Sequence, residues 1–127
     1  MSKHPFQTDT AHLYNQLTNL GINKVDLGWR VFKLMLSEDL KDESGEVSLD
    51  GSTNFTNYEI HLDMSLNDDR AREILLHEII HCILETMSID ENGGKHLKTT
   101  NEQLVVAMTH GFLLIRNLNR SLFSLLY

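Results

Sequence analysis

The stretch from Asn67 to Met87 constrains the fold most, because it contains neither proline nor glycine. Asn67 and Asp68 can cap a helix, and acidic residues fill its first turn. The later positions are apolar nearly all round, at Ile74, Leu75, Leu76, Ile79, Ile80, Ile83 and Leu84. A helix of about five turns with such a surface must be covered by other elements.

The remaining elements follow from hydrophobic spacing. Helical spacing predicts helices over residues 9–20 and 100–119. Residues 27–36 and 46–50 are expected to be strands, and residues 58–65 alternate apolar and polar side chains most regularly. Short links favour an antiparallel-rich sheet of about three strands in an α+β fold.

Composition indicates one domain spanning residues 1–127. The polar, glycine-containing segment 88–100 predicts a loop within that domain. The net charge of −7 and scattered basic residues argue against nucleic acid as a direct ligand. There is no signal-peptide pattern or long apolar span, and Cys82 is the only cysteine. We therefore expect a cytoplasmic protein without a membrane segment or an intrachain disulfide.

Three polar residues interrupt the long apolar helix, at His77, Glu78 and His81. Histidines four residues apart lie one turn apart on one helix face, where both imidazoles can bind one metal ion. Glu78 points about 100° away from His77, which suits a base that takes a proton from a metal-bound water. The alternative is a buried helix whose histidines have ordinary hydrogen-bond partners. Burial favours the metal, because it compensates the buried polar groups most simply.

A catalytic zinc site requires a third protein ligand and an open position. Glu102, at the start of the last helix, is the first candidate. The same glutamate could instead complete a capping box with Thr99. His110 and His96 are the competing ligands.

The segment His77-Glu78-Ile79-Ile80-His81, followed by Asn101-Glu102, resembles the gluzincin type of zincin metallopeptidase. The order of strand, acidic helix start, HEIIH and a second helix is similar to small zincin-like proteins of bacteria and phages, including the ImmA/IrrE type. The resemblance implies a minimal zincin-like fold, one zinc ion bound by His77, His81 and Glu102, and Glu78 as the general base.

The chain departs from the larger gluzincins at Val106, where they carry an aspartate that orients the first histidine. Asp63, Thr109 or a backbone carbonyl could accept that bond instead. Candidate donors to the transition state are Tyr58, His61, His96 and His110. In zincins an edge strand pairs with the substrate, and residues 58–65 could serve as that strand.

These features predict a zinc-dependent metallopeptidase that cleaves a protein or peptide, in the host cytoplasm if a phage encodes it. The alternative is a zincin-like metal-binding module, weakly active or inactive, that binds proteins. A third hypothesis is a structural protein whose C-terminal tail docks on a partner or a second copy. Its apolar residues Leu122, Phe123, Leu125, Leu126 and Tyr127 could equally belong to the core.

Overall fold

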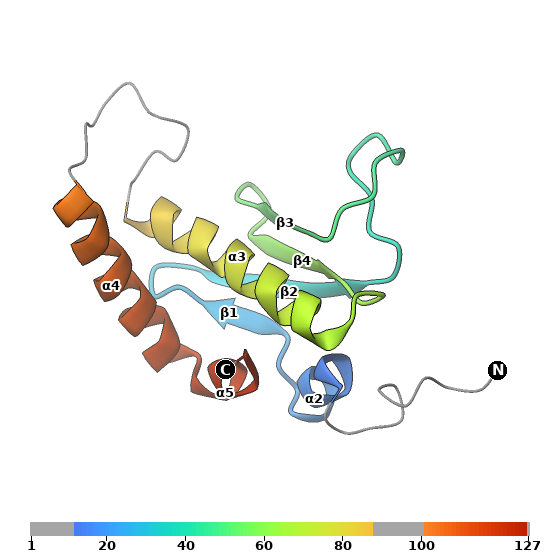
Figure 1. Cartoon of the computed structure of the whole chain (residues 1–127), viewed down its shortest axis with the longest axis horizontal. Coiled ribbons are helices and arrows are strands. Elements are labelled where there is room, and N and C mark those ends of the chain that lie inside the picture. The colour runs from blue at the N-terminus through green and yellow to red at the C-terminus, as the bar shows by residue number, and fades with distance from the viewer. Residues whose placement is uncertain (1–11, 88–100, 127) are drawn as a thin grey trace.

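The computed structural model describes residues 12–87 and 101–126 of the chain. This part forms four helices and a four-stranded sheet (Figure 1). In chain order the elements are α2 (Leu13–Asn19), β1 (Lys24–Asp26), β2 (Val31–Ser37), β3 (Gly51–Asn54), β4 (Glu59–Asp63), α3 (Asp68–Thr86), α4 (Asn101–Leu118) and α5 (Arg120–Leu126). The predicted α+β class is confirmed, whereas the predicted loop at 88–100 lies outside the described residues.

The sheet is mixed, with the strand order β1-β2-β4-β3. The pairs β1–β2 and β3–β4 are antiparallel, but the central pair β2–β4 is parallel, and neither β1 nor β3 was among the predicted strands. After β2 the chain forms β3 at the edge of the sheet and then turns back to place β4 between β2 and β3. Because β4 is antiparallel to β3, it runs in the same direction as β2. The sheet therefore has one strand more than predicted and is not a simple meander.

Strand β3 occupies an edge of the sheet, although its sequence Gly-Ser-Thr-Asn consists of residues that favour turns. Residues 46–50, predicted as a strand, do not form one, although Ser48 makes an isolated bridge with Lys41. The strand predicted at 58–65 is observed as β4, with Ile60 and Leu62 buried. Because β4 lies between β2 and β3, the prediction that it is a substrate-pairing edge is wrong.

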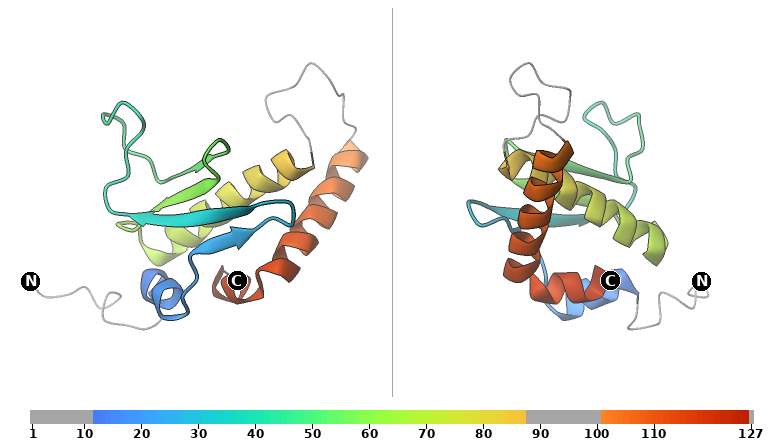
Figure 2. Two further views of the ribbon diagram at one scale, coloured as in Figure 1. Left: turned by 180° about the vertical axis from the view of Figure 1, so that it is seen from behind. Right: turned by 60° about the vertical axis from the view of Figure 1, so that its left-hand side comes forward.

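The two faces of the sheet differ in polarity. Phe32, Leu34, Ile60 and Leu62 are buried on the face that α3 covers. Alternation along the strands sends Lys33, Met35, Glu59 and His61 to the other face. Figure 2 (left) views the sheet from this second side, where none of the helices in the described residues lies over the strands. The hydrophobic core thus lies between one face of the sheet and the helices.

Helix α3 begins and ends as the sequence predicts. The side chain of Asn67 accepts a hydrogen bond from the Arg70 amide, and Asp68 and Asp69 follow in the first turn. The negative charges favour the positive end of the helix dipole. Trp29, in the turn between β1 and β2, donates its indole N–H to Thr86 Oγ1 at 2.8 Å, at the helix C-terminus.

Helices α4 and α5 complete the core. The side chain of Asn119, between them, exchanges two hydrogen bonds of 2.7 Å with the backbone of Asp26 in β1. In α5, Leu122 and Leu126 are buried, and the Phe123 ring packs against that of Phe112 at 5.5 Å. The tail is therefore part of the core up to Leu126.

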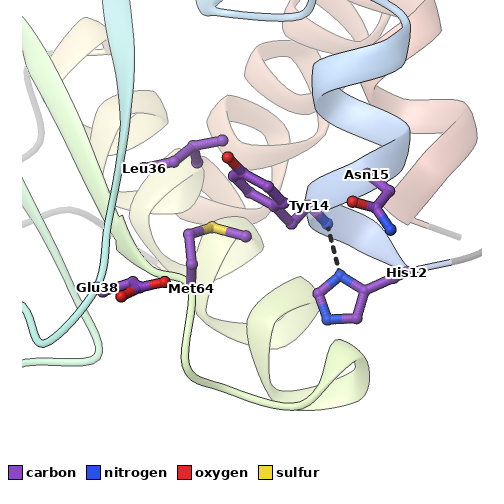
Figure 3. A pocket seen from close by; sticks show the side chains of 6 residues that line it. All are labelled: His12, Tyr14, Asn15, Leu36, Glu38 and Met64. Atoms are coloured by element: carbon purple, nitrogen blue, oxygen red, sulfur yellow. Dashed lines mark hydrogen bonds between the residues drawn. The ribbon is translucent and has the colours of Figure 1, made fainter. Parts of the chain in front are cut away.

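A cavity of about 290 Å³ lies between α2 and the ends of β2 and β4 (Figure 3). It is lined by His12, Tyr14, Asn15, Leu36, Glu38 and Met64. His12 Nδ1 accepts a hydrogen bond from the Tyr14 amide at 3.2 Å. None of the residues predicted to carry chemistry lines this cavity.

Candidate metal centre

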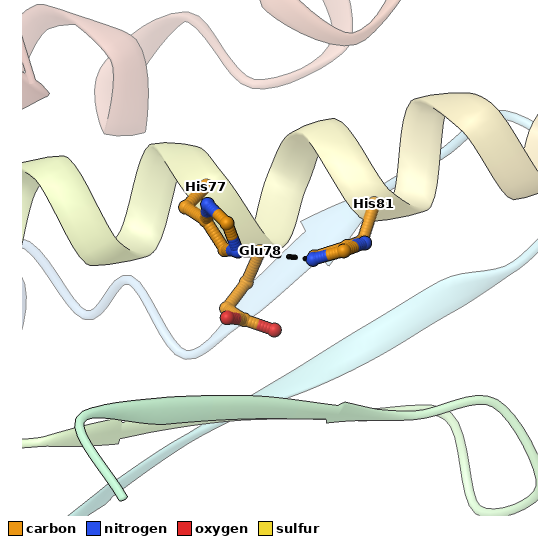
Figure 4. Close-up of side chains that lie close together, drawn as sticks. All are labelled: His77, Glu78 and His81. Atoms are coloured by element: carbon orange, nitrogen blue, oxygen red, sulfur yellow. Dashed lines mark hydrogen bonds between the residues drawn. The ribbon is translucent and has the colours of Figure 1, made fainter. Parts of the chain in front are cut away.

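The described part of the chain brings three potential metal ligands together, and all three lie on α3: His77, Glu78 and His81 (Figure 4). One ligand atom of each lies within 4.8 Å of the others. His77 is exposed, His81 is partly buried, and Glu78 is only 7% exposed. The helix therefore presents two imidazoles towards solvent beside a buried carboxylate.

The two imidazoles converge through their Nε2 atoms, which are 3.0 Å apart. Two histidine nitrogens on one tetrahedral zinc would be separated by about 3.3 Å, given Zn–N distances near 2.05 Å. The pair also has the length of a hydrogen bond, in which one ring donates and the other accepts. The donor set, its spacing and its access to solvent fit a divalent metal such as zinc.

Glu78 points from α3 towards β3, where the Thr53 hydroxyl donates a hydrogen bond to its Oε1 atom at 2.9 Å. A buried carboxylate without partners is costly, and Thr53 supplies one of the required donors. The same bond holds the carboxylate beside the two imidazoles. Thr53 was not identified from the sequence, because it lies in a segment whose composition predicts a turn.

Gly51 allows β3 to approach α3 closely. A Cβ atom at this position would lie 2.6 Å from Ile74 Cγ2 and 3.4 Å from Glu78 Cγ. Gly51 and Thr53 are two residues apart and therefore share the face of β3 that is turned to the helix. A larger residue at position 51 would require β3 or the Ile74 side chain to shift.

The predicted third ligand, Glu102, lies in the first turn of α4 and is exposed. Gly111 packs against α3, since a Cβ there would lie 2.5 Å from Ile83 Cγ2. Glu102 is nine residues earlier and so points about 180° away from Gly111. It is not part of the cluster on α3, and its role as a ligand stays a prediction.

The competing ligands also lie apart from the cluster or are not described. His110 is exposed on α4 and does not belong to the cluster. His96 lies outside the described residues.

The other polar candidates are engaged elsewhere. His61 pairs with Glu59 at 3.0 Å on the face of the sheet opposite α3. The Tyr58 ring lies under the Arg30 guanidinium, 4.2 Å from its carbon. Thr109 donates its hydroxyl to the backbone oxygen of Val105.

Asp63, a second proposed acceptor for a ligand histidine, instead fixes the loop after β4. Burial raises the pKa of this carboxyl, but hydrogen bonds from Ser65 and from backbone amides including that of Leu40 outweigh the effect and lower it. Its two oxygens are thus used by neighbouring loops.

Comparisons with protein-family models, with curated proteins and with solved structures find no match to this chain. Among the helices in the described ranges, none is long and apolar enough to cross a membrane.

Proposed function

We propose that this protein is a zinc-dependent metallopeptidase of minimal zincin-like type. His77 and His81 hold one zinc ion, and Glu78 acts as the general base. The observation that carries the proposal is the convergence of the two Nε2 atoms at 3.0 Å with the Glu78 carboxylate in the same cluster. The sequence resemblance to HExxH proteins supports the same assignment.

Each side chain of the cluster has a separate role in hydrolysis. A zinc ion supplies an acidified water and polarises the carbonyl of the scissile bond. His77 and His81 would hold the metal through their imidazole nitrogens, and the exposure of His77 leaves one side of the site open to substrate. Glu78, held by Thr53, accepts a proton during attack and returns it to the leaving amine.

The edge strand β3 suits an extended peptide substrate. Asp50 is hydrogen-bonded to Asp63 across the β3–β4 ladder, so alternation directs the backbone groups of Gly51 and Thr53 away from β4. A peptide that paired with this edge would run past the cluster on α3. This assigns to β3 the substrate-pairing role that β4 cannot have.

A metal-binding protein–protein interaction module is the second candidate function. The exposure of Glu102 and its absence from the cluster favour it, because the described cluster has two histidine ligands and one carboxylate suited to be a base. Such a module would bind zinc and a protein without cleaving it.

The test combines metal content with cleavage. We would measure zinc per chain after zinc loading and dialysis, and cleavage of an unstructured protein by wild type and Glu78→Gln, with and without chelator. The matched control is Glu73→Gln on the same helix, since the Glu73 carboxylate pairs with Arg70 instead.

A hydrolase requires one zinc per chain, cleavage that chelator abolishes, and loss of cleavage in Glu78→Gln alone. Zinc binding without cleavage would favour the interaction module. Failure to retain zinc would contradict both functions.

A further inference from the structure

The outward side of α4 is apolar and exposed. The Val105 side chain is 57% exposed and the Leu113 side chain 39% exposed, and neither residue belongs to the cluster on α3 or to the hydrophobic core. Val105, Val106 and Leu113 lie on the side of α4 that points away from Gly111, whereas Leu104, Leu114 and Leu118 lie within about 60° of Gly111 and are not part of that side. Three exposed apolar side chains on one side of a helix are typical of an interaction surface.

The charged residues on this surface are arranged symmetrically about Thr109. Glu102 lies seven residues before Thr109 and Arg116 seven residues after it, so all three share one side of the helix. Val105 and Leu113 lie four residues from Thr109 on either side. Glu102 and Arg116 have no side-chain partner among the described residues.

We propose that α4 binds a second copy of this chain through an antiparallel, two-fold symmetric helix pair centred on Thr109. In this arrangement Val105 of each copy packs on Leu113 of the other. Glu102 of each copy lies opposite Arg116 of the other, because both residues are about 10.5 Å from Thr109 along the helix. The surface is therefore complementary to itself in charge and in apolar character.

Thr109 is compatible with a position on the two-fold axis. Its hydroxyl donates to the backbone oxygen of Val105 at 2.7 Å, so it requires no partner from the second copy. Only its methyl group and the surrounding helix surface then meet the symmetry-related Thr109.

The dimer is expected to be weak, since one helix pair covers less than the roughly 1,200–2,000 Å² of a stable interface. A dissociation constant of about 10 µM to 0.1 mM is in keeping with such a contact. The pairing uses neither His77 nor His81, and therefore does not depend on the proposed function. It gives the Glu102 carboxylate a role other than that of a zinc ligand.

The test is sedimentation equilibrium of the full chain from about 1 µM to 0.3 mM. The variants are Leu113→Asp, Arg116→Glu, Glu102→Arg and the charge-exchanged double variant Glu102→Arg/Arg116→Glu. Lys33→Glu, on the exposed face of the sheet, is the matched charge-reversal control. Far-UV circular dichroism checks that each variant keeps its helices.

The wild type and Lys33→Glu should dimerise equally. Leu113→Asp should remain monomeric, and each single charge reversal should weaken dimerisation about tenfold. The double variant should recover most of that loss. Both of its changes oppose the helix dipole, so helix stability alone would make it the weakest dimer. A monomeric wild type, or a double variant no better than the single ones, would overturn the proposal.

Discussion

Replacing Thr53 by valine tests whether strand β3 holds Glu78 in place. Valine keeps the shape of threonine but cannot donate the 2.9 Å hydrogen bond to Glu78 Oε1. The carboxylate is only 7% exposed, so water cannot fully replace the lost donor. A hydrogen bond to a charged group contributes about 1.5–3 kcal/mol, and we expect a loss of about 2 kcal/mol in the free energy of unfolding.

The assay is urea unfolding followed by circular dichroism, together with thermal unfolding. For a domain of this size, a loss of about 2 kcal/mol lowers the Tm by roughly 6–10 °C. Thr53→Ser is the matched control, because serine retains the hydroxyl and should lie closer to the wild type. If zinc is bound, Thr53→Val should reduce cleavage more than zinc affinity, since the hydroxyl contacts the base and not an imidazole.

A double-mutant cycle separates this bond from general packing. Glu78→Leu removes the acceptor, so adding Thr53→Val to it should cost much less than in the wild type. A Thr53→Val variant within about 0.5 kcal/mol of wild type would refute the reasoning. Equal losses for valine and serine would do so too, because the loss could then not come from the hydroxyl.

Three further predictions follow from the same region. His81→Ala should weaken zinc binding at least about a hundredfold in calorimetric titration, whereas His61→Ala should leave it unchanged; equal affinities would remove His81 from the site. Gly51→Ala should destabilise the fold by about 1–3 kcal/mol in urea unfolding, because its Cβ would meet Ile74 Cγ2 at 2.6 Å; wild-type stability would show that the strand shifts freely. The lowered pKa of Asp63 stabilises the fold above its ordinary value of 3.8, and this contribution is lost as the pH falls through the folded-state pKa. Asp63→Asn should therefore lose less stability than wild type between pH 6 and pH 3, and equal pH dependence would contradict the assignment.

Helices α3 and α4 were predictable from sequence because their signals are local and repeated, whereas the separate helix α5 was not predicted. Asn67 caps α3 as expected, and the apolar spacing places α4 within about one residue of its observed ends. His77 and His81 converge for the same reason, since helix geometry alone brings residues four apart together.

Strand β3 and the parallel central pair were not predictable, because they depend on tertiary contacts. Gly51–Asn54 consists of turn-forming residues, and only pairing with β4 makes it a strand. The sequence likewise does not show that β4 pairs with β2 in parallel. The direction in which the Glu102 side chain points depends on how α4 is rotated about its own axis relative to α3. The number of residues between His81 and Glu102 does not determine that rotation.

The strand that sequence analysis missed is also the one that connects the fold to the candidate chemistry. Gly51 has no side chain, which lets β3 lie against Ile74, and Thr53 then reaches Glu78 two residues further on. A larger residue at position 51 would displace β3 or the Ile74 side chain, while α3 would still present both histidines. Metal binding should therefore tolerate changes in β3 that catalysis does not. A chain with this helix but a different edge strand could remain a metal-binding module, and the pair Gly51 and Thr53 is what favours a hydrolase here.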